Sequence, residues 1–318
     1  MMLALGFAIS ITLPNLLLMA LGYFMQRTGA IHADFVNLAS NIVFNYCLPC
    51  LLFFSVIKSQ VDYGQQMWLI LAGVVVTFIL YIGAEVYARC RIAAIEDQGV
   101  FVQGVFRSNM AIISLATVTN AYGDAGLSVG AVYMGVITIL FNILAVITLS
   151  RTQQGQTSGW KKATEIGKKM LKNPLIIALV SAFAYKAMNL PLPPVPIVKT
   201  GELLAGVALP LALICAGASL DLRSMFALSG VSMQASIGRV LIAPLVAVAV
   251  GLYFNLAPLH MGVLFIMVSA PVAAASYVMT KAMGGNATLA ANILAFTTVV
   301  SMLSMGAGAA ILRSLGLM

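Results

Sequence analysis

Ten apolar stretches run through nearly the whole chain, and most of them are long enough to cross a lipid bilayer as helices. A spanning helix needs about 20 mainly apolar residues. Only 8% of the 318 residues are charged, whereas soluble domains carry about 25%. The sequence therefore predicts an all-α polytopic membrane protein with ten transmembrane helices. We place these spans at residues 3–25, 33–57, 66–90, 100–121, 126–150, 174–188, 198–220, 228–253, 260–282 and 287–313.

Three short landmarks occur twice, separated each time by about half the chain. The separations are 160, 161 and 162 residues. Five spans fall into each half, and an odd number forces the second half to insert upside down. We therefore expect a 5+5 inverted repeat, which is typical of secondary transporters whose substrate site lies where the repeats meet. The landmarks are Pro14 with Pro174, Leu48-Pro49 with Leu209-Pro210, and Gly123-Asp124-Ala125-Gly126-Leu127 with Gly285-Asn286-Ala287-Thr288-Leu289.

The basic residues that give the chain its net charge of +8 lie mostly in short loops. The loops after odd-numbered spans hold eleven of them, and the opposite side holds four. Because basic loops stay in the cytoplasm, we expect a multi-pass protein of the plasma membrane, the inner membrane of a bacterium, with both termini extracytoplasmic. This placement predicts a lipid bilayer as the partner and no nucleic acid.

The charge distribution also divides the chain. Residues 1–150 are the expected first five-helix repeat, and residues 174–318 are the second, inverted one. The basic segment 151–173 between them is the expected cytoplasmic linker. Within it, an amphipathic membrane-surface helix over 160–171 and a plain solvated linker both fit the sequence.

The fourth span and its repeat partner, the ninth, carry the features expected of a substrate site. The fourth holds one charge, two asparagines and several hydroxyls, and the ninth holds a proline near its middle. Two broken helices that cross near the midplane would turn half-helix N-termini toward an anion. The alternative is a simple proline kink between packed helices. The candidate substrate-binding residues in these spans are Ser108, Asn109, Ser114, Thr117, Pro271 and Ser276.

Two further candidates for substrate binding lie in other spans. Asn45 precedes Pro49 by one turn and would face a cavity, although Pro49 and its repeat partner Pro210 would also simply bend two helices. Arg239 lies about twelve residues into the eighth span, where an arginine must face protein or water. It would neutralise an anionic substrate or pair with Glu85.

Two charges near the expected cytoplasmic ends of spans complete the list. Glu85 and Arg89 are four residues apart and can pair along one helix face. Glu85 is the candidate for coupling transport to protons. Arg107 is expected to open the fourth span at the membrane interface as a topology anchor.

No pattern of catalytic or metal-binding residues stands in a supporting context. Cys47 and Cys50 form a C-x-x-C, but Leu48-Pro49 lies between them in an apolar span, and no second Cys or His pair has metal-binding spacing. We interpret them as core residues. The sequence contains no nucleophile triad or phosphate-binding loop in context. We expect a protein that is not an enzyme and that uses no metal or cofactor.

Several stretches resemble the auxin efflux carrier family, which includes bacterial malonate-transporter-like proteins and plant PIN carriers. The resemblance covers essentially the whole chain. It rests on Asn45-Tyr46-Cys47-Leu48-Pro49, on Ser108-Asn109 through Gly123-Asp124, and on Ser269-Ala270-Pro271 through Ser276-Tyr277, followed by Gly284-Gly285.

The chain departs from the family pattern at both crossing spans. In the fourth span the pattern is Gly-Asn-x-x-x-x-Gly-x-Pro, of which Asn109 matches while Ser108, Ser114 and Ala116 replace the glycines and the proline. In the ninth span Ala275 stands where an asparagine is common. Whether the fourth span still breaks without its proline is therefore a question for the structure.

The resemblance implies a fold similar to sodium/proton antiporters and bile acid symporters. It implies a scaffold of helices 1, 2, 6 and 7, a moving transport part of helices 3–5 and 8–10, an elevator-like motion and a homodimer. The leading function is a carrier for a small organic anion such as a mono- or dicarboxylate, either proton-coupled or a uniporter. The alternatives are a sodium-coupled symporter of the bile acid type and a non-transporting membrane sensor or assembly partner.

Overall fold

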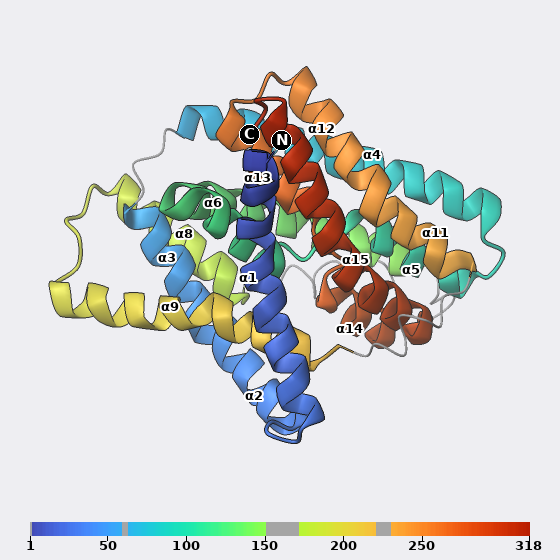
Figure 1. Cartoon of the computed structure of the whole chain (residues 1–318), viewed down its shortest axis with the longest axis horizontal. Helices are drawn as coiled ribbons and strands as arrows, with labels where there is room; N and C mark the ends of the chain where they lie inside the picture. Colours follow the sequence, from blue (N-terminus) through green and yellow to red (C-terminus); the bar gives the residue numbers. More distant parts are fainter. Residues whose placement is uncertain (1, 59–62, 151–171, 221–229) are drawn as a thin grey trace.

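Figure 1 shows a molecule built almost entirely of helices. The computed structural model describes residues 2–58, 63–150, 172–220 and 230–318. The basic segment 151–171, with the expected amphipathic helix over 160–171, lies outside the described residues. The α-helices are α1 (Met2–Arg27), α2 (Ala33–Ile42), α3 (Leu48–Lys58), α4 (Tyr63–Arg91), α5 (Ile95–Phe106), α6 (Leu115–Leu149), α8 (Pro174–Ala187), α9 (Val195–Ala218), α11 (Gly230–Ile237), α12 (Ala243–Tyr253), α13 (Pro258–Ser269), α14 (Ala274–Ala282) and α15 (Ala287–Ser314).

Among the described residues, three one-turn π-helices join or precede some of these α-helices, and two of them stand just before a proline. They are η1 (Val43–Cys47), η2 (Met110–Ser114) and η4 (Gly238–Ile242). Pro49 follows η1 and Pro244 follows η4. A proline ring clashes with the carbonyl four residues earlier, and a widened turn moves that carbonyl away. The chain can therefore continue as one long rod through α2, η1 and α3, and again through α11, η4 and α12.

A glycine within α6 bends this helix. Gly123 has φ 60° and ψ −145°, so two helical segments meet there at a sharp change of direction. A side chain at this backbone conformation would be strained, and glycine alone adopts it readily. The bend separates the residues predicted as the end of the fourth span from those of the fifth.

The helices form two groups, which Figure 1 shows on opposite sides of the molecule. In one group α3 packs against α8 and α9, and in the other α4 packs against α5 and α12. Helix α1 packs along both α9 and α15. The approach of α1 to α9 is so close that a Cβ at Gly22 or Gly217 would collide with the backbone of the facing helix. Small residues at such crossings are typical of membrane helices.

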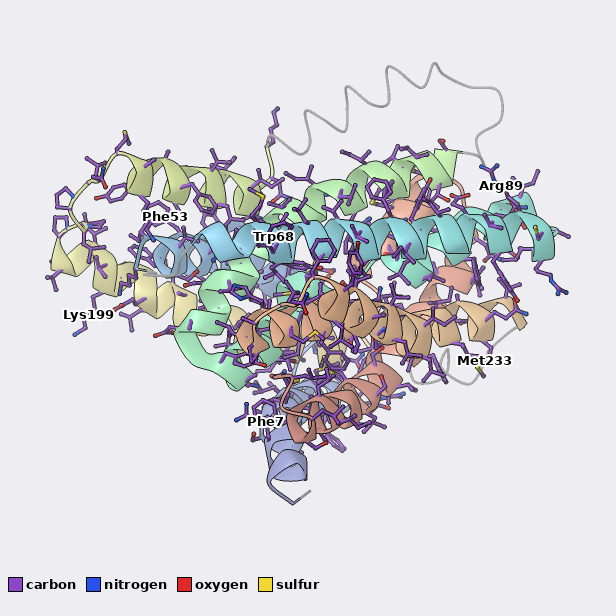
Figure 2. The ribbon with its side chains drawn as sticks, turned by 90° about the horizontal axis from the view of Figure 1, so that it is seen from above. Phe7, Phe53, Trp68, Arg89, Lys199 and Met233 are labelled. Atoms are coloured by element: carbon purple, nitrogen blue, oxygen red, sulfur yellow. The ribbon has the colours of Figure 1, made fainter. Side chains whose placement is uncertain are left out.

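The outer surface of the molecule is rich in large apolar side chains, which cover the long helices in Figure 2. Leu17 is 60% exposed, Trp68 57% and Leu245 68%. Such a surface would drive aggregation in water but is well solvated by lipid. In the described part of the chain, seven helices are long and apolar enough to span a bilayer, and Pro174–Ala187 and Pro258–Ser269 are shorter apolar helices. The prediction of an all-α polytopic membrane protein is confirmed.

Candidate functional site

Two helices break opposite each other, and their broken segments pair through the backbone. α5 ends at Phe106 and η2 begins at Met110, while α13 ends at Ser269 and α14 begins at Ala274. The extended residues between them run antiparallel, with Ser108 opposite Val272. This is the only strand-like pairing among the described residues, and it joins residues more than 160 positions apart.

Two backbone hydrogen bonds close this pairing. The Asn109 N–H donates to the Pro271 carbonyl at 2.7 Å, and the Ala273 N–H donates to the Arg107 carbonyl at 3.2 Å. A helix break at membrane depth frees polar backbone groups that lipid cannot satisfy. Here each break satisfies the other. The fourth span therefore breaks without a proline, and Ala116 lies beyond the break, buried within α6.

A cavity of about 510 Å³ opens beside the paired breaks. Its wall has two sides: η1 and the start of α8 contribute one, and the two breaks and α6 contribute the other. Its size lies in the range of small-molecule sites, about 300–1,000 Å³. The lining residues are Phe44, Asn45, Arg107, Ser108, Asn109, Met110, Ala111, Ile112, Thr138, Phe141, Asn142, Lys172, Asn173, Pro174, Leu175, Ala273, Ala274, Ala275 and Met279.

Arg107 is a buried charged residue of this wall. It is only 5% exposed, and its Nη2 donates to Asn142 Oδ1 at 2.8 Å. Its Nη1 contacts Met279 Sδ at 2.7 Å. A thioether is a weak acceptor, so this second donor can be transferred to a stronger one such as a carboxylate. Lys172, an exposed residue, adds a second positive charge to the cavity.

The two half-helices that leave the breaks also present positive ends to the cavity. Backbone N–H groups in the first turn of a helix have no partner within that helix. Met110 and Ala111 open η2, Ala274 and Ala275 open α14, and all four line the cavity. Helix N-termini favour anions because free N–H groups and the helix dipole both point toward the ligand. The wall thus combines two cationic side chains with two half-helix N-termini.

Comparison with known families agrees with this geometry. The family model described as "Membrane transport protein" matches residues 7–307, which is nearly the whole chain. The chain belongs to this family, the auxin efflux carrier family. A search of curated proteins gave no match. The protein is therefore a multi-pass membrane transporter, and the prediction that it is not an enzyme is confirmed.

Three of the residues predicted to bind substrate line the cavity of this transporter. Ser108 is buried, and its hydroxyl has no partner among the described residues. Asn109 is half-buried at the start of η2. Asn45 is exposed to the cavity, and its Nδ2 donates to the Asn41 carbonyl at 2.9 Å. These side chains bring one hydroxyl and two amides to the wall.

Four other predicted residues lie near the breaks but do not line the cavity. Ser114 is fully buried and weakly contacts the Met267 carbonyl at 3.5 Å. Thr117 donates to the Ile113 carbonyl and accepts from Asn15 of α1, so it joins helices. Pro271 contributes its backbone carbonyl to the pairing. Ser276 is 5% exposed on α14, and its hydroxyl has no partner among the described residues.

Arg239 is sealed away from the cavity. It is fully buried in η4, where its Nη1 donates to the Val105 carbonyl at 2.9 Å. Val105 lies in the last turn of α5, whose free carbonyls carry a negative partial charge. Arg239 does not line this cavity, and its Nη1 contacts the end of the broken helix. A direct role of Arg239 in binding substrate stays a prediction.

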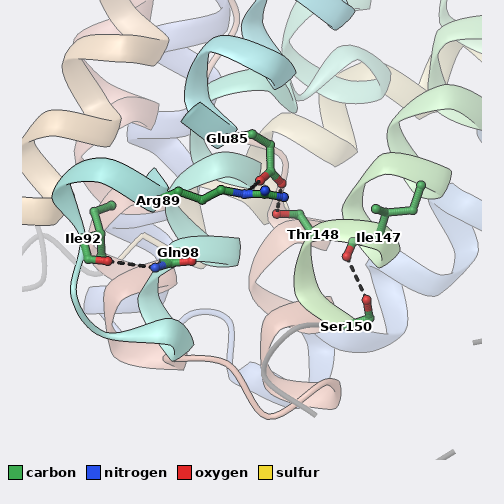
Figure 3. A network of polar contacts seen from close by, with 7 residues as sticks. All are labelled: Glu85, Arg89, Ile92, Gln98, Ile147, Thr148 and Ser150. Atoms are coloured by element: carbon green, nitrogen blue, oxygen red, sulfur yellow. Dashed lines mark hydrogen bonds and ion pairs between the residues drawn. The ribbon is translucent and has the colours of Figure 1, made fainter. Parts of the chain in front are cut away.

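Glu85 also lies away from the cavity, in the polar network of Figure 3. It accepts a hydrogen bond from Thr148 Oγ1 at 2.7 Å and pairs with Arg89, whose Nε lies 3.7 Å from Glu85 Oε2. The predicted pairing of Glu85 with Arg89 is confirmed. The alternative pairing of Glu85 with Arg239 stays a prediction.

Sequence reasoning missed Arg107, Asn142 and Lys172 as cavity residues. Arg107 was predicted to be an interfacial anchor, and that prediction is wrong because the residue is buried at the break. α5 begins at Ile95, five residues before the predicted span, so Arg107 lies more than three turns from the helix start. The fold brings Asn142 to it from the other half of α6. The sequence feature that could have identified Arg107 as a cavity residue is its charge within a predicted span.

Proposed function

We propose that this transporter is an elevator-type carrier of a small organic anion, such as a mono- or dicarboxylate. The observation that carries the proposal is the cavity in which Arg107, Lys172 and the N-termini of η2 and α14 meet. No Asp or Glu lines this cavity in the described part of the chain. Its electrostatics therefore favour a negatively charged ligand.

The helix boundaries support a ten-span 5+5 inverted repeat. When segments joined by π turns or by extended breaks are counted as single spans and α6 is divided at Gly123, the described helices group into ten. The paired breaks at 107–109 and 270–273 then fall in the fourth and ninth spans, and they would form the crossover of such a repeat.

A second cavity supports movement of one helix group against the other. It measures about 740 Å³ and lies between α3, α9 and the bend of α6. Lys58 pairs with Glu202 on one wall, and Asp124 lies on another. Both cavities therefore lie between α6 and the continuous rod formed by α2, η1 and α3. A scaffold of spans 1, 2, 6 and 7 and a moving part of spans 3–5 and 8–10 would open them alternately.

The membrane setting follows from loop charge. The excess of basic residues after odd-numbered spans supports a plasma-membrane carrier, in a bacterium the inner membrane, with both termini outside the cytoplasm. A homodimer through the scaffold is part of the proposal. The carrier would work either as a uniporter or with transport coupled to protons through Glu85.

Flux into liposomes tests the proposal. Purified protein would be assayed with radiolabelled mono- and dicarboxylates, with and without a pH gradient and a sodium gradient. An Arg107→Ala variant and an Asn109→Ala/Pro271→Ala double variant should lose most flux. Arg27→Ala, which removes an exposed arginine at the end of α1, should transport normally.

Three results would contradict parts of this proposal. Normal flux in the double variant would show that the site lies elsewhere. Flux driven by sodium would favour a symporter of the bile acid type. Absence of flux for every acid, together with a protein partner that copurifies, would favour a sensor or assembly role.

A further inference from the structure

A third cavity, at the turn between α12 and α13, takes no part in the proposed transport site. It measures about 580 Å³ and lies where α4 passes this turn. Its lining combines three aromatic rings with one histidine and one asparagine. The lining residues are Trp68, Tyr253, Phe254, Asn255, Leu256, Ala257 and His260.

The aromatic rings lie together on one part of the cavity wall. The centroids of Trp68 and Phe254 are 6.1 Å apart, and those of Tyr253 and Phe254 are 5.6 Å apart. Trp68 is 57% exposed and Tyr253 82% exposed, so ring surface is free for a ligand. Ring faces attract organic cations, including ammonium groups.

Another part of the cavity favours an anion. α13 begins there with Pro258 in its first turn, and no side chain caps it. The N–H groups of Leu259 and His260 therefore have no partner within the helix. A second observation points the same way, because His260 is only 5% exposed and its Nε2 has no partner among the described residues. A phosphate oxygen at this position would accept from the helix N-terminus and from the imidazole.

The edge of the cavity meets the lipid-facing surface. Met67 beside Trp68 is 57% exposed, and Leu252 beside Tyr253 is 49% exposed. Figure 2 shows Trp68 on α4, well separated along the helix from Arg89. Tryptophan and tyrosine concentrate at the membrane–water interface, where a turn between two spans also lies. A ligand with both a polar head and acyl chains fits this position.

We propose that this cavity binds the headgroup of a zwitterionic phospholipid. The ammonium lies against Trp68, Tyr253 and Phe254, and the phosphate lies at the N-terminus of α13 beside His260. No Lys, Arg, Asp or Glu lines the cavity in the described part of the chain, which favours a headgroup of zero net charge. Because α4, α12 and α13 pack together, the lipid would bind one helix group only.

Native mass spectrometry of the purified full chain tests the proposal. Phosphatidylethanolamine should be retained about tenfold more tightly than phosphatidylglycerol, since only the former carries an ammonium group. A Trp68→Leu/Tyr253→Leu variant should lose this preference. Phe24→Leu, which removes a ring of α1 that is 63% exposed, should keep it. His260→Leu should weaken both lipids, and His260→Gln, which keeps a donor, should weaken them less.

Two results would overturn the inference. Equal retention of the two lipids by the unmodified protein would show that the rings do not bind the ammonium group. This comparison uses only the unmodified protein, so it does not depend on whether a variant folds. Displacement of the lipid by soluble glycerophosphoethanolamine at the same concentration would mean that the cavity binds a free phosphodiester and not a membrane lipid.

Discussion

The two helix breaks reach the same geometry from different sequences. The break at 107–109 holds an arginine, a serine and an asparagine without proline, while the break at 270–273 holds a proline among small apolar residues. Both are extended, and each supplies one donor and one acceptor to the other. The first break therefore forms without a proline, with the partner backbone supplying its hydrogen bonds.

The breaks also differ in what they give to the cavity. The first contributes the side chains of Arg107 and Asn109, and the second contributes the backbone N–H groups at the start of α14. Pro271 itself is buried. A charged side chain and a backbone dipole thus approach the same cavity from opposite halves of the chain, and the following predictions test this comparison.

The largest effect on stability is expected from Ala121→Pro, which places a proline in α6 well after the break. The ring would clash with the carbonyl of Thr117, and the apparent free energy of unfolding in detergent should fall by about 3 kcal/mol. Ala116→Pro is the matched control and should be better tolerated, because residue 116 follows η2 by two positions, as Pro49 follows η1 and Pro244 follows η4. An Ala116→Pro variant as unstable as Ala121→Pro would mean that the π turn at η2 does not make room for a proline.

The next largest effect concerns the charge at the first break. Arg107→Met should weaken binding of a carboxylate substrate by about 10- to 100-fold, because a buried charge-assisted hydrogen bond is lost. The measurement is KM for flux into liposomes, with Arg27→Met as the control. An unchanged KM would mean that the backbone N–H groups alone bind the substrate.

The hydrogen bonds between the breaks give a smaller effect. Ala273 has φ −68°, which proline also adopts, so Ala273→Pro removes only the N–H that donates to the Arg107 carbonyl. Unfolding should become easier by about 1–2 kcal/mol. If Ala273→Pro is as stable as the unmodified protein, the pairing does not hold the breaks in place.

The smallest effect is expected from Pro271→Ala alone. The carbonyl of residue 271 still accepts from Asn109, and only the conformational restriction of the unfolded chain is lost. The free energy of unfolding should fall by less than about 1 kcal/mol. A much larger loss would restore proline as the cause of the second break.

The positions of the helices were largely predictable, and the predicted ends of single spans lie close to the observed ones. The first span was predicted at 3–25 and is Met2–Arg27, and the seventh was predicted at 198–220 and is Val195–Ala218. These ends follow from apolar length and from flanking charges, which act locally. The backbone pairing of Asn109 with Pro271 was not predictable, because it joins residues far apart in sequence.

The sequence by itself determined that this protein crosses a membrane many times and that its fourth and ninth spans carry polar or helix-breaking residues. Apolar length and charge suffice for that, because lipid tolerates no other arrangement of such a chain. Only the tertiary structure decided that Arg107 lines the cavity while Arg239 is sealed against Val105. Both are buried arginines, and which helices pack around each one decides whether its charge reaches a ligand.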